Sequence, residues 1–572
     1  MGLDLCYFLG ATLVFLLPGV GLGLWFGVGP TRLDRCITGC SVGLALAVWL
    51  ATSLSYFDLR LFYPAWIVIA AISLRGFMPR NTGAPGAGVA VWVMLTLAVV
   101  AATRFALALP PTLPEGWDPA FHMILARKIQ LTQHAISNWE PFVDAELNYP
   151  TGSHTLLVVF AAVSGLPLPI VFKFLIQLLG VLTTAQIYSL ARAATGNENT
   201  GLFAAIAYGL WAGSGSIEYF SWGGLPNELA MLFLVAMLTI WIERGSLALM
   251  ALLYGGLILA HHHVMVVSAA IIMAVFFWRR DRQGVRLAAA ALCGGAIDAL
   301  FLVRYAPHVL AIGSTGVFHG GEDLMPLAHF AGGMGWALLA VGAVGIVLFC
   351  RRGGRDEGRP DSSLMIASCV LVTLFVGGEY LWPLITRWRG EDPSTAFTPS
   401  RFPIDLSYFL AIFAGLAIAA IQVRFRLRTS RLFGIALLLS LTELPLWLNL
   451  AGNLPLANAE YARACQWVNG HSSPTAVILD ADIWTCYLAW RKAAWPPLPA
   501  SEPQRDILRV FVTAEGVLAG RIAPPWHDYQ ILRIGEPNET VQGRVLWRDA
   551  SGYYVEQLWP RFTDSRASRQ RS

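Results

Sequence analysis

Charged residues are scarce in this sequence: Asp, Glu, Lys and Arg make up 13% of its 572 residues. In an ordinary soluble domain these four residue types make up about a quarter. Hydrophobic residues, in contrast, reach 56%. This composition excludes a soluble enzyme and a disordered chain, and it predicts a polytopic membrane protein. The formal net charge of +4 is too small to indicate a nucleic-acid partner.

Cysteine is rare as well, and none of the eight cysteines forms a CxxC pair of the kind that binds metals. Six of them lie in or beside apolar runs, where we expect small core residues. Cys465 and Cys486 share the more hydrophilic C-terminal part of the chain. A disulfide between them would persist only in an oxidising compartment, so the sequence leaves this pairing open.

Long apolar runs dominate the first 450 residues. Because one span needs about 20 apolar residues, they predict an all-α polytopic membrane bundle of about fourteen spans. The run that begins at Met1 lacks a basic start and a cleavage site, so we expect a retained span rather than a signal peptide. The runs lie at 3–28, 37–56, 62–78, 88–109, 168–191, 200–216, 226–242, 246–260, 264–278, 286–306, 331–350, 362–385, 404–422 and 432–450.

Arginines occur mainly in alternate loops between these runs, and the positive-inside rule places those loops in the cytoplasm. The amino terminus, the connector 110–152 and the tail 451–572 are then expected on the outer side. We predict a multi-pass protein of a bacterial inner (plasma) membrane. The basic loops contain Arg32, Arg35, Arg75, Arg80, Arg192, Arg244, Arg279, Arg280, Arg282, Arg286, Arg351, Arg352, Arg355, Arg359, Arg424, Arg426, Arg428 and Arg431.

The tail 451–572 has the pattern of a small extracytoplasmic α/β domain. A helix is predicted over 458–470 and a strand over 475–480. The runs "YQILRI", "GRVLWRD" and "GYYVEQLW" alternate apolar and polar residues and are separated by turn residues, which predicts three further strands.

The connector 110–152 is the longest interruption among the apolar runs, and connectors of this length are usually functional or disordered. Asp118 followed by Pro119 predicts a helix start, with the aspartate as N-cap. His122, four residues later, then points the same way as Asp118. Both are candidate catalytic residues, although a capping aspartate and a surface histidine explain the pattern equally well. Arg127 and Lys128 suit the polar face of an interfacial helix.

Three further groups are candidates for the same chemistry. Glu218 lies in a polar loop between two spans, and the triplet His261, His262 and His263 lies between two short apolar runs. Three consecutive helical residues cannot share one face, but a hairpin tip can direct two of them inward. A histidine of this tip, together with Asp118 or His122, can bind a metal; a simple polar tip is the alternative. Arg387, Arg389 and Arg401 form the main outer cationic cluster and suit phosphate oxygens, or else anchor lipid headgroups.

Several ionisable residues lie within the apolar runs and mostly in their predicted outer halves. A charge at mid-bilayer costs roughly 2.5–3.5 kcal/mol on insertion scales, so these residues must line a polar cavity or pair with one another. We therefore expect a water-accessible polar region near the outer face. The residues are Lys173, Glu228, Asp298, Glu379, Asp405 and Glu443.

Two segments carry a family resemblance. "GWDPAFHMILARKI" at 116–129 and "NYPTGSHTLLVVFAAVSGLP" at 148–167 resemble the first outer loop of GT-C glycosyltransferases. This superfamily includes oligosaccharyltransferase catalytic subunits and protein O-mannosyltransferases. The resemblance implies a catalytic or metal-binding role for Asp118. It also implies that 88–450 is the GT-C-like catalytic core and that 1–87 contains extra N-terminal helices.

The resemblance further implies a function. The expected reaction transfers a sugar or glycan from a polyprenyl-(pyro)phosphate donor, embedded among membrane lipids, to a glycan, lipid or protein acceptor on the outer side. Asp118 would be the general base, with Glu218 and His122 completing the site and Arg401, Arg387 and Arg389 binding the donor phosphate. The leaving phosphate would be stabilised by these cations or by a divalent metal, Mg or Mn, on Asp118 and the histidine triplet. A transporter or flippase of a lipid-linked glycan is the alternative.

Overall fold

The computed structural model divides the chain into two units. The first comprises Met1–Pro110, Ile129–Ala135 and Asn148–Leu454, and the second Pro111–Lys128, Ile136–Leu147 and Pro455–Ser572. Much of the connector 110–152, which we expected to be the outer loop of the GT-C-like core, groups with the C-terminal tail. The structure describes residues 2–78, 87–109, 117–138, 147, 149–211, 223–299, 302–303, 318–319, 334–352, 362–389, 394–395, 402–444, 459–473, 476–479, 483–494, 530–535, 537–539, 541 and 544–559.

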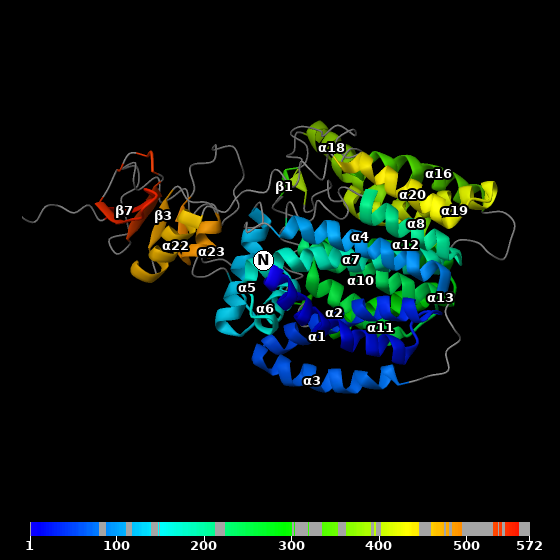
Figure 1. Ribbon diagram of the computed structural model, residues 1–572, viewed down its shortest axis with the longest axis horizontal. Helices are drawn as coiled ribbons and strands as arrows, with labels where there is room; N and C mark the ends of the chain where they lie inside the picture. Colours follow the sequence, from blue (N-terminus) through cyan, green and yellow to red (C-terminus); the bar gives the residue numbers. More distant parts are fainter. Residues whose placement is uncertain are drawn as a thin grey trace, which may run out of the picture. The chain divides into compact units, whose positions relative to one another are not determined.

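The first unit is a bundle of helices, in which α7 and α10 run side by side and α10 also packs against α2 and α11 (Figure 1). Its first half contains α1 (Gly2–Phe26), α2 (Arg32–Ser55), η1 (Leu59–Leu61), α3 (Phe62–Ser73), η2 (Leu74–Phe77), α4 (Ala87–Ala108), α6 (Gly152–Ser164), α7 (Leu168–Thr195), α8 (Glu198–Ile206) and the π-helix η3 (Ala207–Trp211).

The second half of the bundle pairs α16 with α19 and α8 with α19. A short β1–β2 ladder, Phe318–His319 against Ser394–Thr395, accompanies it. Its helices are α10 (Leu225–Ile242), α11 (Leu247–Ala260), α12 (His262–Arg279), α13 (Arg282–Ile297), α16 (Trp336–Arg352), α17 (Ser363–Val376), the π-helix η5 (Gly377–Leu381), α18 (Trp382–Arg389), α19 (Phe402–Phe425), α20 (Thr429–Ser440) and η7 (Leu441–Glu443).

The described part of the chain contains nine helices long and apolar enough to cross a membrane, and four shorter apolar helices. The chain is therefore a multi-pass integral membrane protein. The expected number of about fourteen spans is not confirmed, although each predicted run overlaps a helix within the described residues. The helix α6, which we did not predict, has only 13 residues. At 1.5 Å per residue it is about 20 Å long, which is too short to cross a hydrocarbon core of about 30 Å.

Small residues allow α1 and α2 to approach closely. A Cβ atom added at Gly39 would lie 2.6 Å from the carbonyl oxygen of Gly19, and one at Gly43 would lie 2.8 Å from the Gly19 Cα atom. These neighbours are backbone atoms, so they cannot move aside as a side chain can. Gly39 and Gly43 are four residues apart and face the same helix, an arrangement typical of small-residue packing in membranes.

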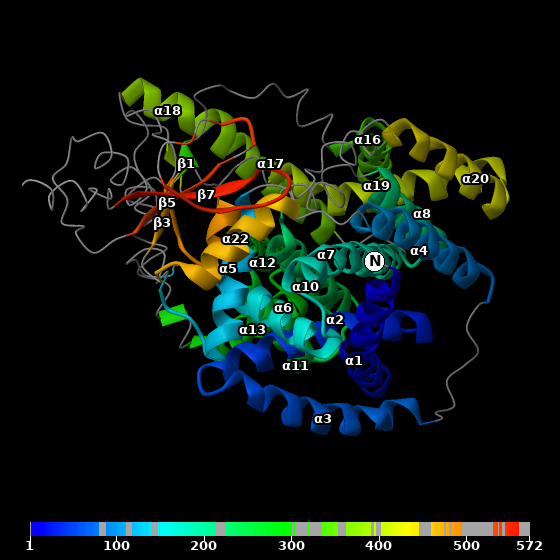
Figure 2. The ribbon, with the colours of Figure 1, turned by 60° about the vertical axis from the view of Figure 1, so that its left-hand side comes forward.

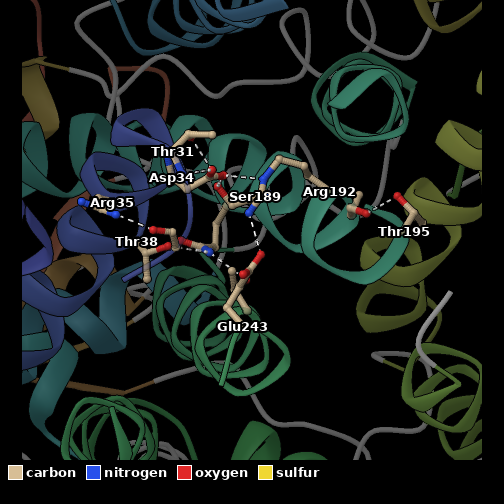
Figure 3. A network of polar contacts seen from close by, with 12 residues as sticks. Thr31, Asp34, Arg35, Thr38, Ser189, Arg192, Thr195 and Glu243 are labelled. Carbon is tan, nitrogen blue, oxygen red and sulfur yellow. Dashed lines mark hydrogen bonds and ion pairs between the residues drawn. The ribbon is translucent and has the colours of Figure 1, made fainter. Parts of the chain in front are cut away.

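A buried network ties α2, α7 and α10 together (Figure 3). Arg192 Nε donates to Asp34 Oδ1 over 2.9 Å, and Arg192 Nη2 donates to Glu243 Oε1 over 2.7 Å. Ser189 Oγ donates to Asp34 Oδ1 over 3.1 Å. We expected Arg192 in a basic loop, but it lies in the last turn of α7 and is buried.

The C-terminal part of the second unit contains a five-stranded sheet with the order β4-β3-β5-β7-β6. The strand β3 is parallel to both neighbours, and β7 is antiparallel to both of its neighbours. Figure 2 shows β5 and β7 side by side, and α22 packs against both. The elements are α22 (Ala459–His471), β3 (Val477–Leu479), α23 (Ile483–Ala489), β4 (Lys492–Ala494), β5 (Ile531–Gly535), β6 (Arg544–Arg548) and β7 (Tyr554–Trp559).

The predicted α/β pattern of the tail is largely present. The helix expected over 458–470 is α22, and the strand expected over 475–480 contains β3. The three alternating runs contain β5, β6 and β7. Among the described elements of the tail, the edge strand β4 and the short helix α23 were not predicted, since three and seven residues leave little periodicity to recognise. Cys465 is buried in α22, and its pairing with Cys486 stays a prediction.

Candidate functional site

Two carboxylates are fully buried in the first turns of helices. Glu228 lies at the start of α10 and Asp405 at the start of α19, and both have a relative exposure of 0%. The amino end of a helix carries a partial positive charge, which favours a carboxylate there. The helix starts therefore offset part of the cost of burying these charges, as does the pairing of each carboxylate with other side chains.

Asp405 connects three helices. Its Oδ2 lies 3.0 Å from His263 Nε2, and its Oδ1 accepts a hydrogen bond of 3.3 Å from Asn227 Nδ2. His263 is the second residue of α12 and Asn227 the third of α10, so the starts of α10, α12 and α19 meet around one carboxylate. The contact with Asp405 fixes the orientation of the His263 imidazole, because it holds the Nε2 atom in place.

Four histidines and one tyrosine form a second group, which we call the histidine cluster: Tyr149, His154, His261, His262 and His263. The ring of Tyr149 lies 5.7 Å from His154, 6.0 Å from His261 and 5.3 Å from His262, measured between centroids. The rings of His261 and His263 are 6.0 Å apart. Because His263 also contacts Asp405, the histidine cluster and the three helix starts form one continuous polar region.

The tip between α11 and α12 directs two of its three histidines inward, as the sequence suggested. His261 and His263 are each 2% exposed, whereas His262 is partly exposed. His261 follows α11 with an extended backbone, φ −157° and ψ 126°, so the helical direction is broken there. This break is what allows neighbouring histidines to face the same interior.

Gly152 brings the start of α6 against the end of α11. A Cβ atom at this position would lie 2.6 Å from the carbonyl oxygen of Leu259, so no side chain fits. Two residues later, His154 is 1% exposed and enters the histidine cluster. The glycine thus explains how α6 comes close to the end of α11, with His154 beside Tyr149 of the histidine cluster.

Glu228 faces a buried arginine. Arg104 of α4 is 0% exposed, and the two side chains interact electrostatically. Both flank Gly180 of α7, where an added Cβ atom would lie 3.2 Å from Arg104 Nη1 and 3.4 Å from Glu228 Oε1. Within the described part of the chain, neither carboxylate oxygen of Glu228 has a hydrogen-bond partner. The absence of a side chain at Gly180 therefore leaves room for these two buried, oppositely charged side chains.

Two tyrosines lie next to this pair. The rings of Tyr208 and Tyr408 are 4.8 Å apart, and both side chains interact electrostatically with Arg104. Tyr208 belongs to the π-helix η3, which directly precedes the segment containing Glu218. π-Helical turns are frequent at functional sites because they shift side chains out of the regular helical register.

The other candidates from the sequence are distributed as follows. Asp118 and His122 both lie on α5 (Trp117–Thr132), in the portion that belongs to the second unit, and His122 is 8% exposed. The helix begins at Trp117, so Asp118 lies inside its first turn rather than at the N-cap. Glu218 and Arg401 lie outside the described residues, as does the side chain of Arg387, and Arg389 is exposed at the end of α18.

Metal binding depends on how donor side chains are grouped. Among the residues that the structure describes, no group of three His, Cys, Asp or Glu residues has an arrangement that could hold a metal ion. Within the polar region, His263 and Asp405 contact each other directly, and together they offer two metal ligands at most. The described residues alone therefore do not fit a metal centre, and a metal site on Asp118, His261, His262 or His263 stays a prediction.

Sequence reasoning missed Arg104, Tyr149, His154 and Asn227. Arg104 did leave a signal, since it interrupts the apolar run 88–109 and a charge there requires a partner. The buried state of Lys173, Glu228, Asp298, Glu379 and Asp405 is confirmed. Tyr149 and His154 lie in the segment 148–167 that carries the family resemblance, but neither was assigned a role from the sequence. Asn227, next to Pro226, looked like an ordinary turn residue.

No protein-family model matches the sequence, and no curated protein matches it. Solved structures do match. The Archaeoglobus fulgidus oligosaccharyltransferase tethered to an acceptor peptide with an NVT sequon has a TM-score of 0.52 and 13% identity, over 78% of this chain and 69% of that one. A second structure of that enzyme, in complex with Zn and sulfate, has a TM-score of 0.50 and 15% identity, over 70% of this chain and 62% of that one.

These similarities extend over most of this chain, so they concern the arrangement of the membrane helices as a whole rather than one local motif. Identities of 13% and 15% are informative about the fold alone. The resemblance to GT-C enzymes that two sequence segments suggested is thereby supported by the three-dimensional structure. The chain has the GT-C-like membrane fold of an archaeal oligosaccharyltransferase.

Proposed function

We propose that this chain is a membrane glycosyltransferase that transfers a sugar or glycan from a polyprenyl-(pyro)phosphate donor to an acceptor on the outer side of the membrane. The observation that carries the proposal is the similarity in fold to an oligosaccharyltransferase, with a TM-score of 0.52 over 78% of the chain. The buried polar region at the starts of α10, α12 and α19 supports it, because such a region is costly unless it serves a function.

The reaction replaces one bond at the anomeric carbon of the sugar by another. The bond from this carbon to the donor phosphate breaks, and its electron pair leaves with the phosphate. An acceptor hydroxyl or amide forms the new bond and releases a proton. We assign Asp118 as the base that takes up this proton, with His122 and Glu218 assisting. Arg401, with Arg387 and Arg389, is assigned to the charge that develops on the phosphate.

The polar region has two features that suit a phosphate-bearing headgroup. His263 is held by Asp405 and His261 lies beside it, both buried, so imidazole groups, which can donate hydrogen bonds, gather at this place. The starts of three helices add partial positive charge at the same place. The sulfate in one similar structure was bound by that enzyme, and an anion of the same kind in this chain is part of the proposal.

Turnover by purified protein in detergent tests the proposal. Radiolabelled sugars on polyprenyl phosphate or pyrophosphate are incubated with the protein, and release of the lipid phosphate is measured. We expect turnover by the wild type and loss of at least about a hundredfold in Asp118→Asn, the scale of a missing general base. Asp58→Asn is the matched control, because Asp58 also lies at the start of a helix. It is the N-cap of η1, where its side chain accepts a hydrogen bond from the backbone N–H of Arg60.

Two results would contradict the proposal. One is full turnover by Asp118→Asn, which removes the central residue assignment. The other is transport of the labelled lipid across sealed vesicles without any turnover, which favours the flippase. The panel should include peptide, glycan and lipid acceptors, since the acceptor is the least constrained element of the proposed reaction.

A further inference from the structure

Arg127 of α5 is enclosed by aromatic residues of the C-terminal domain, within the second unit. Its guanidinium carbon lies 4.6 Å from the ring centroid of Trp490 and 5.4 Å from that of Tyr487. Its Nη1 also donates a hydrogen bond to the backbone carbonyl oxygen of Tyr487. The contact therefore combines cation–π attraction with a directional hydrogen bond. Burial lowers the pKa of Arg127 and raises that of Tyr487 to about 12, so Tyr487 keeps its proton at neutral pH.

The residue that supplies one of these rings has a strained backbone. Trp490 follows the end of α23 and has a φ of +52°, in the left-handed region that a bulky side chain rarely adopts. Such strain persists only where the surroundings impose it. The strained turn places the indole ring under Arg127.

The next residue, Arg491, fixes this turn to α22. It is 6% exposed, and its Nη2 donates to the carbonyl oxygens of Asn469 over 3.0 Å and Ser472 over 2.8 Å. Its Nε donates to Ser472 Oγ over 3.0 Å. These acceptors lie at the carboxyl end of α22, where carbonyl groups lack helical partners and a cation is favoured. Arg491 thus holds the strained turn of Trp490 in place.

Lys128, the neighbour of Arg127, makes a second attachment. Its Nζ donates to the carbonyl oxygen of Asn138 over 2.8 Å and to Asn138 Oδ1 over 2.5 Å. The sequence suggested that Arg127 and Lys128 form the polar face of an interfacial helix. The structure instead uses both cations for contacts within the protein, which explains their presence on a side that otherwise has few basic residues.

The position of Arg127 on α5 relates its contact with Trp490 and Tyr487 to the orientation of Asp118. Asp118 lies nine residues earlier on the same helix, which corresponds to about two and a half turns and to the opposite face. A contact that fixes the face of Arg127 therefore fixes the direction in which Asp118 points. Asp118 and Arg127 lie on one uninterrupted helix, and the intervening residues Met123, Ile124 and Ala126 are buried.

We propose that Trp490 and Arg491 of the C-terminal domain form a clamp that holds α5 through Arg127 and thereby orients Asp118. Arg127 is a positioning residue in this arrangement and has no contact with substrate. The clamp gives the C-terminal domain a role, because the domain then fixes the helix that bears Asp118. The effect on catalysis follows only if the proposed function holds, whereas the structural effect does not depend on it.

Hydrogen–deuterium exchange of the full-length protein in nanodiscs tests the clamp. Exchange is measured for peptides covering 117–132 in the wild type, Arg127→Ala, Arg127→Lys and Trp490→Gly. Glycine at 490 removes the ring and tolerates the positive φ, so it separates loss of the contact from loss of the turn. We expect about tenfold faster exchange of α5 in Arg127→Ala and Trp490→Gly, with an intermediate value for Arg127→Lys. The double variant should exchange no faster than either single variant.

Matched controls come from the same domain. Trp467 stacks on His471 and Trp547, and Arg463 pairs with Glu460 and Asp549, but neither contacts α5 in the described part of the chain. We expect Trp467→Ala and Arg463→Ala to leave the exchange of α5 unchanged. Wild-type exchange in Arg127→Ala and Trp490→Gly would overturn the clamp, and so would an equal increase in α5, α22 and the bundle helices, which indicates general destabilisation. Trp490→Gly and Arg127→Lys keep the test decisive if Arg127→Ala does not fold.

Donor turnover provides the second measurement. Arg127→Ala should lower kcat at least about tenfold and change the KM for the donor by less than about twofold, because the helix rather than the donor site is disturbed. Arg127→Lys should recover part of kcat. A wild type without turnover contradicts the proposed function, and the exchange result still decides whether the clamp exists.

Discussion

Single residues in the polar region are stabilised by specific partners rather than by solvent. Asp405 has His263 and Asn227, and Glu228 has Arg104 beside it. The arrangement differs from an ordinary surface ion pair because every group is buried. In such surroundings, the loss of one partner leaves the other as an uncompensated charge, which costs more than the pair itself contributes.

Substitution of Glu228 tests this directly. We expect Glu228→Gln to lower the free energy of unfolding by about 3–5 kcal/mol, because Arg104 then lacks its carboxylate. The double variant Arg104→Met with Glu228→Leu should recover most of this loss, since it removes both charges. Unfolding by titration with SDS in mixed micelles provides the measurement. Wild-type stability of Glu228→Gln would show that Arg104 does not depend on this carboxylate.

Asp549 in the C-terminal domain gives a prediction about pH. Burial alone raises the pKa of Asp549, but hydrogen bonds from Ser551 and Arg463 outweigh burial and hold the pKa below its usual value. A depressed pKa in the folded state stabilises the fold above the unfolded-state pKa of about 3.9, and this contribution is lost as the pH falls below it. We expect Asp549→Asn to reduce the acid sensitivity of the domain between about pH 5 and pH 3.

Near-UV circular dichroism during an acid titration measures this effect. Glu460→Gln is the matched control, because Glu460 also pairs with Arg463 but does not hold the turn at Ser551. An Asp549→Asn variant with the same acid midpoint and slope as the wild type would refute the assignment.

At the scale of elements, α10 has polar residues at both of its ends. Asn227 and Glu228 lie in its first turn, and Glu243, directly after its last residue, contacts Arg192. The helix has 18 residues and is therefore about 27 Å long, close to the thickness of a hydrocarbon core. The middle of the helix is apolar and almost wholly buried. This distribution agrees with a helix that crosses the hydrocarbon core and has polar residues at each side of it.

The Arg192 network should contribute strongly to stability. The side chain of Arg192 is 9% exposed and that of Asp34 is 0% exposed. We expect Arg192→Ala to lower the free energy of unfolding by about 3–5 kcal/mol. Arg279→Ala is the matched control, since Arg279 pairs with Asp281 at exposures of 27% and 45% and should cost less than about 1 kcal/mol. Equal losses in both variants would contradict the distinction between buried and exposed pairs.

The contact between α1 and α2 predicts that alanine substitutions at two glycines change the free energy of unfolding differently. Gly39→Ala places a Cβ atom against the backbone of Gly19, so we expect a loss of about 1–3 kcal/mol. Gly10 lies on the same helix pair with nothing within 4 Å of an added Cβ atom. Gly10→Ala should therefore be neutral or stabilise by up to about 1 kcal/mol through helix propensity. Thermal unfolding followed by fluorescence compares the two, and a stable Gly39→Ala variant would refute the close contact.

At the scale of the whole molecule, the sequence predicts elements with strong periodicity and misses those without it. The apolar runs coincide with helices, and the alternating runs of the tail contain β5, β6 and β7. The helix α6 was missed because its 13 residues fall short of a span and begin at polar residues. The strand β4, with three residues, depends on pairing with β3, which no local pattern reveals.

The candidate site shows the same division. The sequence identified the chemistry-bearing residues at the histidine tip and the buried carboxylates, because charges and imidazoles are conspicuous in apolar runs. It did not reveal that His263 pairs with Asp405, 142 residues away, or that Arg104 faces Glu228. Such pairings depend on which helices are neighbours in the folded bundle. They become visible only when the fold is known.

The most direct test of the account is the position of the donor phosphate in an experimental structure with a bound polyprenyl phosphate. We predict density for the phosphate at the starts of α10, α12 and α19, within hydrogen-bond reach of the histidine cluster or Arg401. Replacement of His261 or His263 by Ala should then weaken binding of the lipid phosphate. Density at the opposite end of α10, beside Arg192 and Glu243, or only on the lipid-facing surface of the helices, would contradict the assignment of this region as the donor site.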